Sequence, residues 1–123
     1  MFPTEDAIVD AYALVRVRFS LGQAFSRPAI RVALRDAEHL AEDVFESPAA
    51  LLFAFGRTPR SFAGFRTMTV LLALDQVRAS GQRLLAGVGV QKLGEVVEGV
   101  LRREMVYGDV RTVFADALFP FGG

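Results

Sequence analysis

Ser47-Pro-Ala-Ala-Leu-Leu-Phe-Ala-Phe55 and Met68-Thr-Val-Leu-Leu-Ala-Leu74 are the two stretches that decide the fold. The leading Ser-Pro pair of the first is a helix-start signal, because serine caps helix N-termini and proline is favoured in the first turn. The seven residues that follow carry no polar side chain, so a helix made of them must be buried on every side. The second stretch indicates another core helix, which we expect from about residue 62 to 80. The sequence therefore predicts two buried central helices joined through residues 58–67.

Apolar residues at three- and four-residue spacing indicate four further helices. We expect them at about residues 5–20 and in the segments Ile30 to Val44, Leu93 to Leu101 and Val110 to Leu118. No stretch alternates apolar and polar residues around a hairpin turn, so a sheet is not expected. A chain of 123 residues is long enough for one core. The predicted fold class is all-α, a compact bundle of about six helices in a single domain, 1–123.

Charge and cysteine content exclude several classes of protein. Fourteen basic and fourteen acidic residues cancel, so no overall field favours nucleic acid, and a nucleic-acid partner is not expected. The absence of Cys excludes disulfides, thiolate metal sites and a cysteine nucleophile, and it fits a reducing compartment, the cytoplasm. No apolar run approaches the roughly 20 residues that span a bilayer, and the first residues lack a secretory pattern. We therefore expect no membrane association.

The chain is rich in apolar residues, which make up 52% of it and include eleven Phe. Such a content predicts that some apolar surface meets a partner. The tail is the nearest candidate, since Leu118, Phe119 and Phe121 fall within four residues of one another. Two interpretations stay open for it: the tail folds back on the body, or it forms a homo-oligomer contact.

The connection between the two central helices has the features of an anion site. Helix N-termini present unpaired N–H groups and a partial positive charge. No acidic residue occurs between residues 47 and 74, a segment that holds three arginines. The candidate phosphate- or nucleotide-binding residues are Arg66, Gly64, Thr67, Arg60, Arg57 and Thr58. The alternative is that Arg57 and Arg60 are solvated and partly neutralised by the acidic run 36–46, and that Arg66 pairs with a carboxylate or a carbonyl.

Residues 58–67 read Thr-Pro-Arg-Ser-Phe-Ala-Gly-Phe-Arg-Thr. This segment resembles the motif of the Fic/Doc family, the Fic-type transferases and death-on-curing toxins, which is His-Pro-Phe-x-Asp-Gly-Asn-(Lys/Gly)-Arg-Thr. Pro59, Arg66 and Thr67 match. Residues 44–57 are similar to the Ala/Leu-rich helix that precedes the motif, and residues 79–84 to the turn that follows it. The resemblance covers roughly residues 26–118.

The resemblance implies where the family's chemistry has been replaced. The position of the general base is Thr58, whose hydroxyl has no useful basicity near neutral pH. The position of the magnesium-binding acid is Phe62, which offers no oxygen to a hard cation, so magnesium is not expected. The Asn position is Gly64. Arg66 keeps the fork that grips phosphate oxygens, so the implied ligand is ATP or another nucleotide. We predict an impaired or inactive enzyme with no catalytic and no metal-binding residue.

The resemblance also implies a biological setting. Death-on-curing proteins are bacterial toxins restrained by a small antitoxin, so an antitoxin-like protein is an expected partner. Two alternatives remain. The chain is an active nucleotidyl- or phosphotransferase that uses another base, Asp43 and Glu46 being the nearest acidic residues. Otherwise it is a self-associating helical interaction domain.

Overall fold

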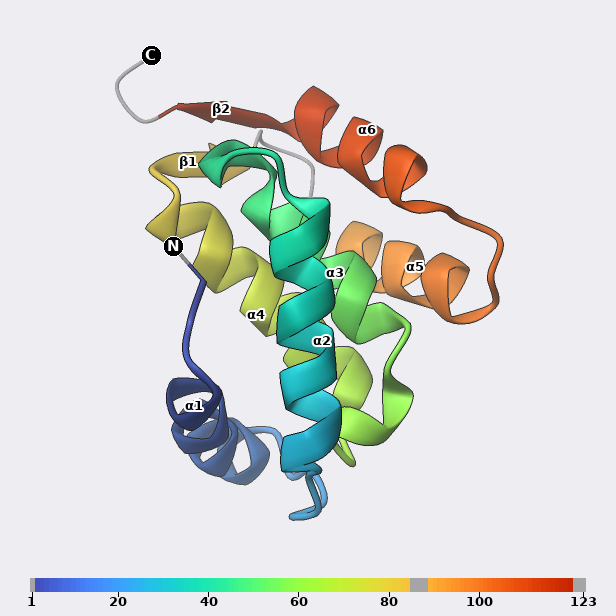
Figure 1. Cartoon of the computed structure of the whole chain (residues 1–123). Helices are drawn as coiled ribbons and strands as arrows, with labels where there is room; N and C mark the ends of the chain where they lie inside the picture. Colours follow the sequence, from blue (N-terminus) through green and yellow to red (C-terminus); the bar gives the residue numbers. More distant parts are fainter. Residues whose placement is uncertain (1, 85–88, 121–123) are drawn as a thin grey trace.

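The computed structural model describes residues 2–84 and 89–120 (Figure 1), the last three of them by their backbone alone. The helices are α1 (Glu5–Arg18), α2 (Arg27–Leu40), α3 (Ser47–Gly56), α4 (Phe65–Ala79), α5 (Val90–Leu101) and α6 (Tyr107–Ala117). Two 3₁₀ turns, η1 (Val44–Glu46) and η2 (Pro59–Ser61), and two short strands, β1 (Gln82–Leu84) and β2 (Leu118–Pro120), complete it. The predicted all-α fold of about six helices is confirmed.

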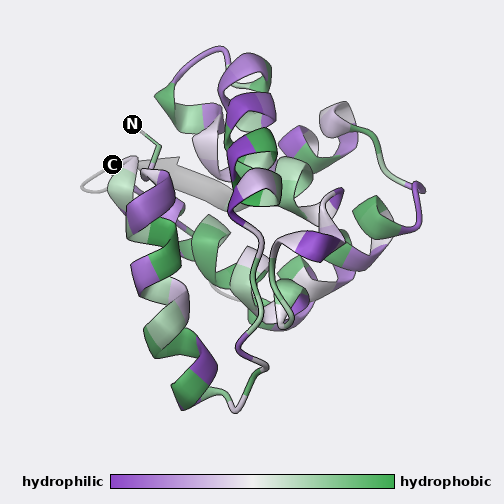
Figure 2. Ribbon diagram, turned by 60° about the horizontal axis from the view of Figure 1, so that its bottom comes forward, coloured by the Kyte–Doolittle hydropathy of each residue, from purple (hydrophilic) through white to green (hydrophobic). Residues whose placement is uncertain are grey.

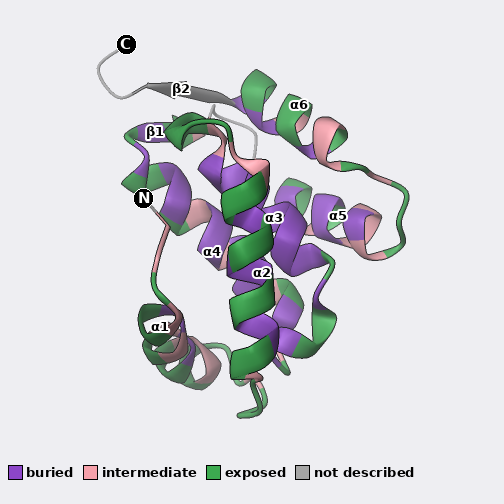
Figure 3. Ribbon diagram, in the orientation of Figure 1, coloured by how far each residue is buried: buried purple, intermediate pink, exposed green. Residues whose placement is uncertain are grey.

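Helix α3 is the centre of the bundle. All of its residues are buried, and it packs against α2, α4, α5 and α6 (Figures 1 and 3). This placement confirms that its uniformly apolar sequence requires burial on every side. The predicted capping role of Ser47 is wrong, because Ser47 is the first residue of the helix. Its hydroxyl instead donates to the Val44 carbonyl and accepts a bond from Gln76 of α4, which ties the two central helices together.

Two of the helix boundaries that differ from the prediction have a clear cause in the structure. α2 ends at Leu40 because the chain becomes extended at Ala41, and the Asp43 carboxylate then accepts two backbone N–H bonds that start η1. α4 begins at Phe65 instead of residue 62, because Phe62 is extended and forms a β-bridge with Phe25. In both places a hydrogen bond outside the helix competes with the helical ladder.

The tail folds back on the body, one of the two interpretations left open. β2 pairs with β1 in an antiparallel ladder in which Leu118 lies opposite Leu84 and Pro120 opposite Gln82. This ladder of three-residue strands is the whole sheet content of residues 2–84 and 89–120 and leaves the fold class unchanged. Phe121 lies outside the described residues, and a contact between copies through the tail stays a prediction.

Helix α1 lies at one end of the bundle, mainly against α2 (Figure 1). Ile8 and Tyr12 are buried on its inner side. At its N-terminus, Arg27 of α2 binds Glu5 at 2.6 Å and Asp6 at 2.8 Å, and these two carboxylates raise the pKa of the guanidinium. The outer side of α1 is nevertheless rich in apolar residues, as the green turns after the N-terminus in Figure 2 show.

Candidate functional site

Residues 58–67, the motif loop, join the two central helices α3 and α4, as the sequence predicts. The connection between α1 and α2 lies against this loop. The Ser26 N–H donates to the Ser61 carbonyl at 2.9 Å, and the Ala63 N–H donates to the Ala24 carbonyl at 2.8 Å. Together with the bridge between Phe25 and Phe62, these bonds make a short backbone pairing between distant segments. Residues 19–26 therefore lie against the motif loop.

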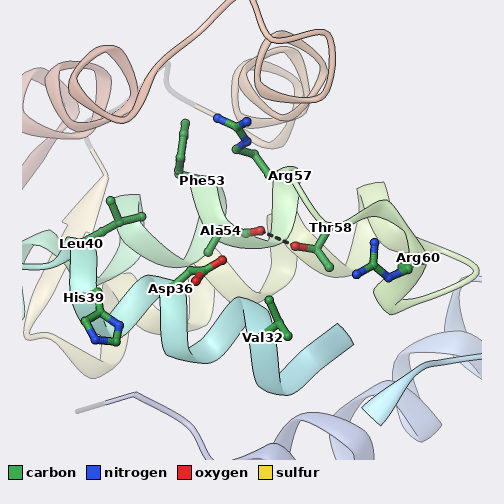
Figure 4. Close-up of a pocket in the computed structure, with 9 residues that line it drawn as sticks. All are labelled: Val32, Asp36, His39, Leu40, Phe53, Ala54, Arg57, Thr58 and Arg60. Atoms are coloured by element: carbon green, nitrogen blue, oxygen red, sulfur yellow. Dashed lines mark hydrogen bonds between the residues drawn. The ribbon is translucent and has the colours of Figure 1, made fainter. Parts of the chain in front are cut away.

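Thr58, at the position of the family's general base, has a structural role. Its side chain is buried, and its hydroxyl donates to the Ala54 carbonyl at 2.9 Å (Figure 4). Its own carbonyl accepts bonds from the N–H and the hydroxyl of Ser61. These bonds satisfy one of the last carbonyls of α3 and hold the η2 turn. The hydroxyl is thus engaged as a donor to the backbone of the preceding helix.

Phe62, at the position of the magnesium-binding acid, belongs to the core. Its side chain is only 2% exposed. Its ring centroid lies 4.7 Å from that of Tyr12 and 6.0 Å from that of Phe55. Aromatic rings at such distances attract one another and exclude water. The residues here therefore do not fit a magnesium ion, which requires oxygen ligands and keeps several waters.

Gly64 stands at the N-terminus of α4, where an anion would approach, and it is covered. Its N–H donates to the Tyr12 hydroxyl at 2.9 Å, and that hydroxyl donates to the Gly22 carbonyl at 2.7 Å. Leu21 lies so close that a Cβ atom at position 64 would be 2.6 Å from its Cδ1. Tyr12 and Leu21 thus occupy the approach to this end of α4.

Arg66 points to α5, where it forms an ion pair with Glu98 and lies 5.4 Å from the Phe65 ring centroid. The hydrogen bond from Arg66 lowers the pKa of the Glu98 carboxyl, and the same bond raises the pKa of the guanidinium. The sequence left Arg66 either to bind an anion or to pair with a carboxylate or carbonyl, and in the structure it pairs with a carboxylate. Thr67 lies beside it, half-buried, in a hollow next to α5.

The other candidates lie on a different side of the loop. Arg57, Thr58 and Arg60 line a pocket of about 510 Å³ between α2 and the end of α3. Asp36 and His39 of α2 line the same pocket, so one carboxylate of the acidic run shares it with these arginines. Val32, Leu40, Phe53 and Ala54 supply its apolar walls.

The two arginines of this pocket do not converge. The Arg57 guanidinium lies 5.4 Å from the Phe53 ring centroid, and Figure 4 shows it pointing away from Arg60. The His39 Nδ1 lies 2.8 Å from the Arg35 carbonyl of its own helix, on the exposed surface. The predicted set is therefore divided into a pocket group, the covered Gly64, and the Arg66–Thr67 pair beside α5.

Three residues important for this arrangement were not among the sequence candidates. Tyr12 was recognisable only as an apolar-spaced residue of the first helix, Leu21 as part of a connection, and Glu98 as one of many surface carboxylates. Their roles depend on hydrogen bonds and contacts between segments far apart in the sequence. No local pattern carries that information.

We predict a pH dependence from the Arg66–Glu98 pair. The pKa of Glu98 is lowered below its ordinary value of 4.5, so its contribution is full above that value and is lost as the pH falls through the lowered pKa. Glu98→Gln should therefore lower stability slightly at pH 7 and flatten the fall in stability below pH 4.5. Arg66 is exposed and Glu98 is half-buried at the surface, so the effect should be smaller than that of any core substitution.

Urea unfolding of the wild type and of Glu98→Gln at a series of pH values measures this dependence. Glu95→Gln on the same helix is the matched control, since Glu95 forms no ion pair within residues 2–84 and 89–120. Identical acid profiles for the wild type and Glu98→Gln would show that the pair contributes nothing.

Among residues 2–84 and 89–120, no three His, Asp or Glu side chains gather as a metal site requires. In the same part of the chain, no helix combines the length and apolar character needed to cross a bilayer. Neither a family model nor a curated protein sequence matches this chain.

Proposed function

We propose that this protein is a Fic/Doc-like helical domain without transferase activity that acts by binding another protein. The observation that carries the proposal is that the side chains of the motif loop have structural roles. The loop joins two buried central helices, while Thr58 and Phe62, at the positions of base and acid, serve the fold through a backbone hydrogen bond and an aromatic cluster. Side chains engaged in this way neither take a proton from an attacking hydroxyl nor hold a metal ion.

The alternative base candidates do not favour an active transferase. Asp43 caps η1, and Glu46 accepts a hydrogen bond from the Tyr107 hydroxyl at 2.8 Å. Both precede α3, whereas the motif loop follows it. Because α3 has ten residues, its two ends lie about 15 Å apart. A base must be within hydrogen-bond reach of the proton that it takes.

A protein ligand is favoured over a nucleotide. Phosphate at the start of α4 would have to displace Leu21 from Gly64 and the Tyr12 hydroxyl from its N–H. It would also have to compete with Glu98 for Arg66. The resemblance suggests a small antitoxin-like protein as partner, in a bacterial cytoplasm.

Incubation with ATP labelled in the α- or the γ-phosphate tests whether the protein lacks transferase activity. With magnesium and a bacterial extract we expect no transfer of label from the α- or the γ-phosphate to any protein beyond the transfer seen with the extract alone. Arg66→Gln is the variant that matters, with Arg35→Gln, an exposed arginine of α2, as its control. Label transfer that Arg66→Gln abolishes and Arg35→Gln leaves intact would overturn the proposal.

Calorimetric titration with ATP and ADP tests the preference for a protein ligand. We expect no heat of binding at millimolar nucleotide for the wild type. Glu98→Gln releases Arg66, so weak binding by this variant alone would support the view that the ion pair closes the site. Binding by the wild type that disappears in Arg66→Gln would show instead that the phosphate site is open.

A further inference from the structure

A trough runs along the outer side of α4. One hollow of about 500 Å³ lies between α1 and α4, and a second of about 310 Å³ lies between α4 and α5. Both are lined by Phe19 and Leu71, so the two hollows adjoin at these side chains, and together they form the trough. Most of the remaining lining is apolar: Ala11, Val15, Met68, Leu72 and Leu74 in the first, Val70 and Val90 in the second.

The α1 wall of this trough continues into an exposed apolar ridge. Leu14 is 76% exposed and Val17 is 67% exposed. Leu14 follows Ala11 by three residues and precedes Arg18 by four, and both of these line the trough, so Leu14 stands at its edge. Single exposed apolar residues are ordinary, but a ridge beside an apolar trough is a contiguous patch. Figure 2 shows the apolar colouring of this helix.

The edge of the trough carries charges of both signs. Arg18 from α1 and Asp75 and Arg78 from α4 line it. None of the three forms an ion pair with another residue in the described part of the chain. The formal net charge of the protein is zero, so two copies do not repel one another at long range.

We propose that the trough binds a second copy of this chain in a two-fold dimer, a property that goes beyond the proposed function. A two-fold interface uses the same patch on both partners, so the patch must be complementary to itself. Here the ridge of Leu14 and Val17 lies beside the trough, so each copy inserts its ridge into the trough of the other. The same symmetry brings Asp75 of one copy toward the arginines of the other. A second copy thus covers the trough and the exposed side chains of Leu14 and Val17 with one and the same surface.

Light scattering and sedimentation of the full chain over a range of concentrations measure the association. We expect a dimer. Leu14→Glu and Val17→Glu should each weaken it by at least about tenfold, because each places a carboxylate in the apolar contact. The matched control is Val106→Glu, which changes an equally apolar residue that is 64% exposed but lies on the α5–α6 connection. It should leave the dimer intact.

Cross-linking gives a second and independent readout. The chain has no Cys, so Leu14→Cys and Val106→Cys each provide a single thiol. Addition of the two thiols to the two rings of a short bis-maleimide should join two copies of Leu14→Cys and leave Val106→Cys unjoined. Circular dichroism confirms that each variant is folded, and a misfolded Leu14→Glu leaves Val17→Glu and the cross-link to decide.

Several results would overturn the proposal. A wild type that stays monomeric at the highest soluble concentration would do so. So would a dimer that resists both glutamate variants, or one that Phe119→Ser dissociates while Leu14→Glu does not, because that would place the contact at the tail. None of these results bears on label transfer from ATP, so the dimer and the proposed function fail separately.

Discussion

Replacing Phe62 by Asp, the residue that the resembling motif has at this position, is expected to unfold the protein at room temperature. The Phe62 ring packs on Tyr12 and Phe55 and is nearly inaccessible to solvent. Removal of a buried aromatic ring costs about 3–5 kcal/mol. A buried carboxylate without a partner adds a further penalty of about 1–3 kcal/mol or more. The sum is comparable to the whole stability of a typical domain, about 5–15 kcal/mol.

Circular dichroism and urea unfolding measure this effect. Phe62→Leu keeps the position apolar and is the matched control, with an expected loss of about 1–2 kcal/mol. The double variant Thr58→His/Phe62→Asp, which restores the motif's base and acid, should be unfolded and inactive as well. A folded Phe62→Asp with wild-type stability would mean that the position tolerates a carboxylate, and the interpretation of the loop as a structural element would be wrong.

The parts of the fold that local patterns control could be predicted. α3 has no polar face, which leaves burial as its only stable arrangement, and its position at the centre of the bundle follows from its composition. The Thr4 side chain caps α1 by accepting from the Ala7 N–H, as N-cap preferences indicate. Gly81, with a φ of +74°, ends the α4 region, as a C-terminal glycine should.

The parts of the fold that depend on contacts between distant segments could not be predicted from the sequence. Phe62 was predicted to begin a helix, because nothing near it in sequence shows that Phe25 would hold it extended. The β1–β2 ladder was missed because three-residue strands are too short to show alternation. The absence of acidic residues between 47 and 74 suggested a positively charged site, yet Glu98 and Asp36 arrive from α5 and α2.

The candidate site shows the same division. Sequence reasoning identified that Thr58 and Phe62 lack the chemistry of the residues they resemble by position. It did not identify what the two residues do instead. The bond from the Thr58 hydroxyl to the Ala54 carbonyl and the packing of the Phe62 ring on Tyr12 exist only in the folded chain. In the structure both positions carry side chains that serve the fold, and the start of α4 is covered at Gly64 by Tyr12 and Leu21.

Tyr12→Phe is expected to loosen that cover and to destabilise the protein by about 2 kcal/mol. The substitution keeps the ring that packs on Phe62 and removes only the hydroxyl. That hydroxyl bonds the Gly22 carbonyl and the Gly64 N–H, so its loss leaves two backbone groups without their partner. An orphaned polar group costs about 1–3 kcal/mol when fully buried, and these bonds are partly buried, which sets the estimate toward the low end.

Amide hydrogen exchange locates the effect. The Gly64 amide should exchange faster in Tyr12→Phe by a larger factor than amides in α3, because the opening is local to the cover. Tyr107→Phe is the control: its hydroxyl donates to Glu46 at the other end of α3, so its loss should leave exchange at Gly64 unchanged. Equal acceleration at Gly64 and throughout α3 would mean that residues 19–26 open only when the whole domain unfolds. In that case the start of α4 is closed to anions in every folded form, and a nucleotide ligand would require a different site.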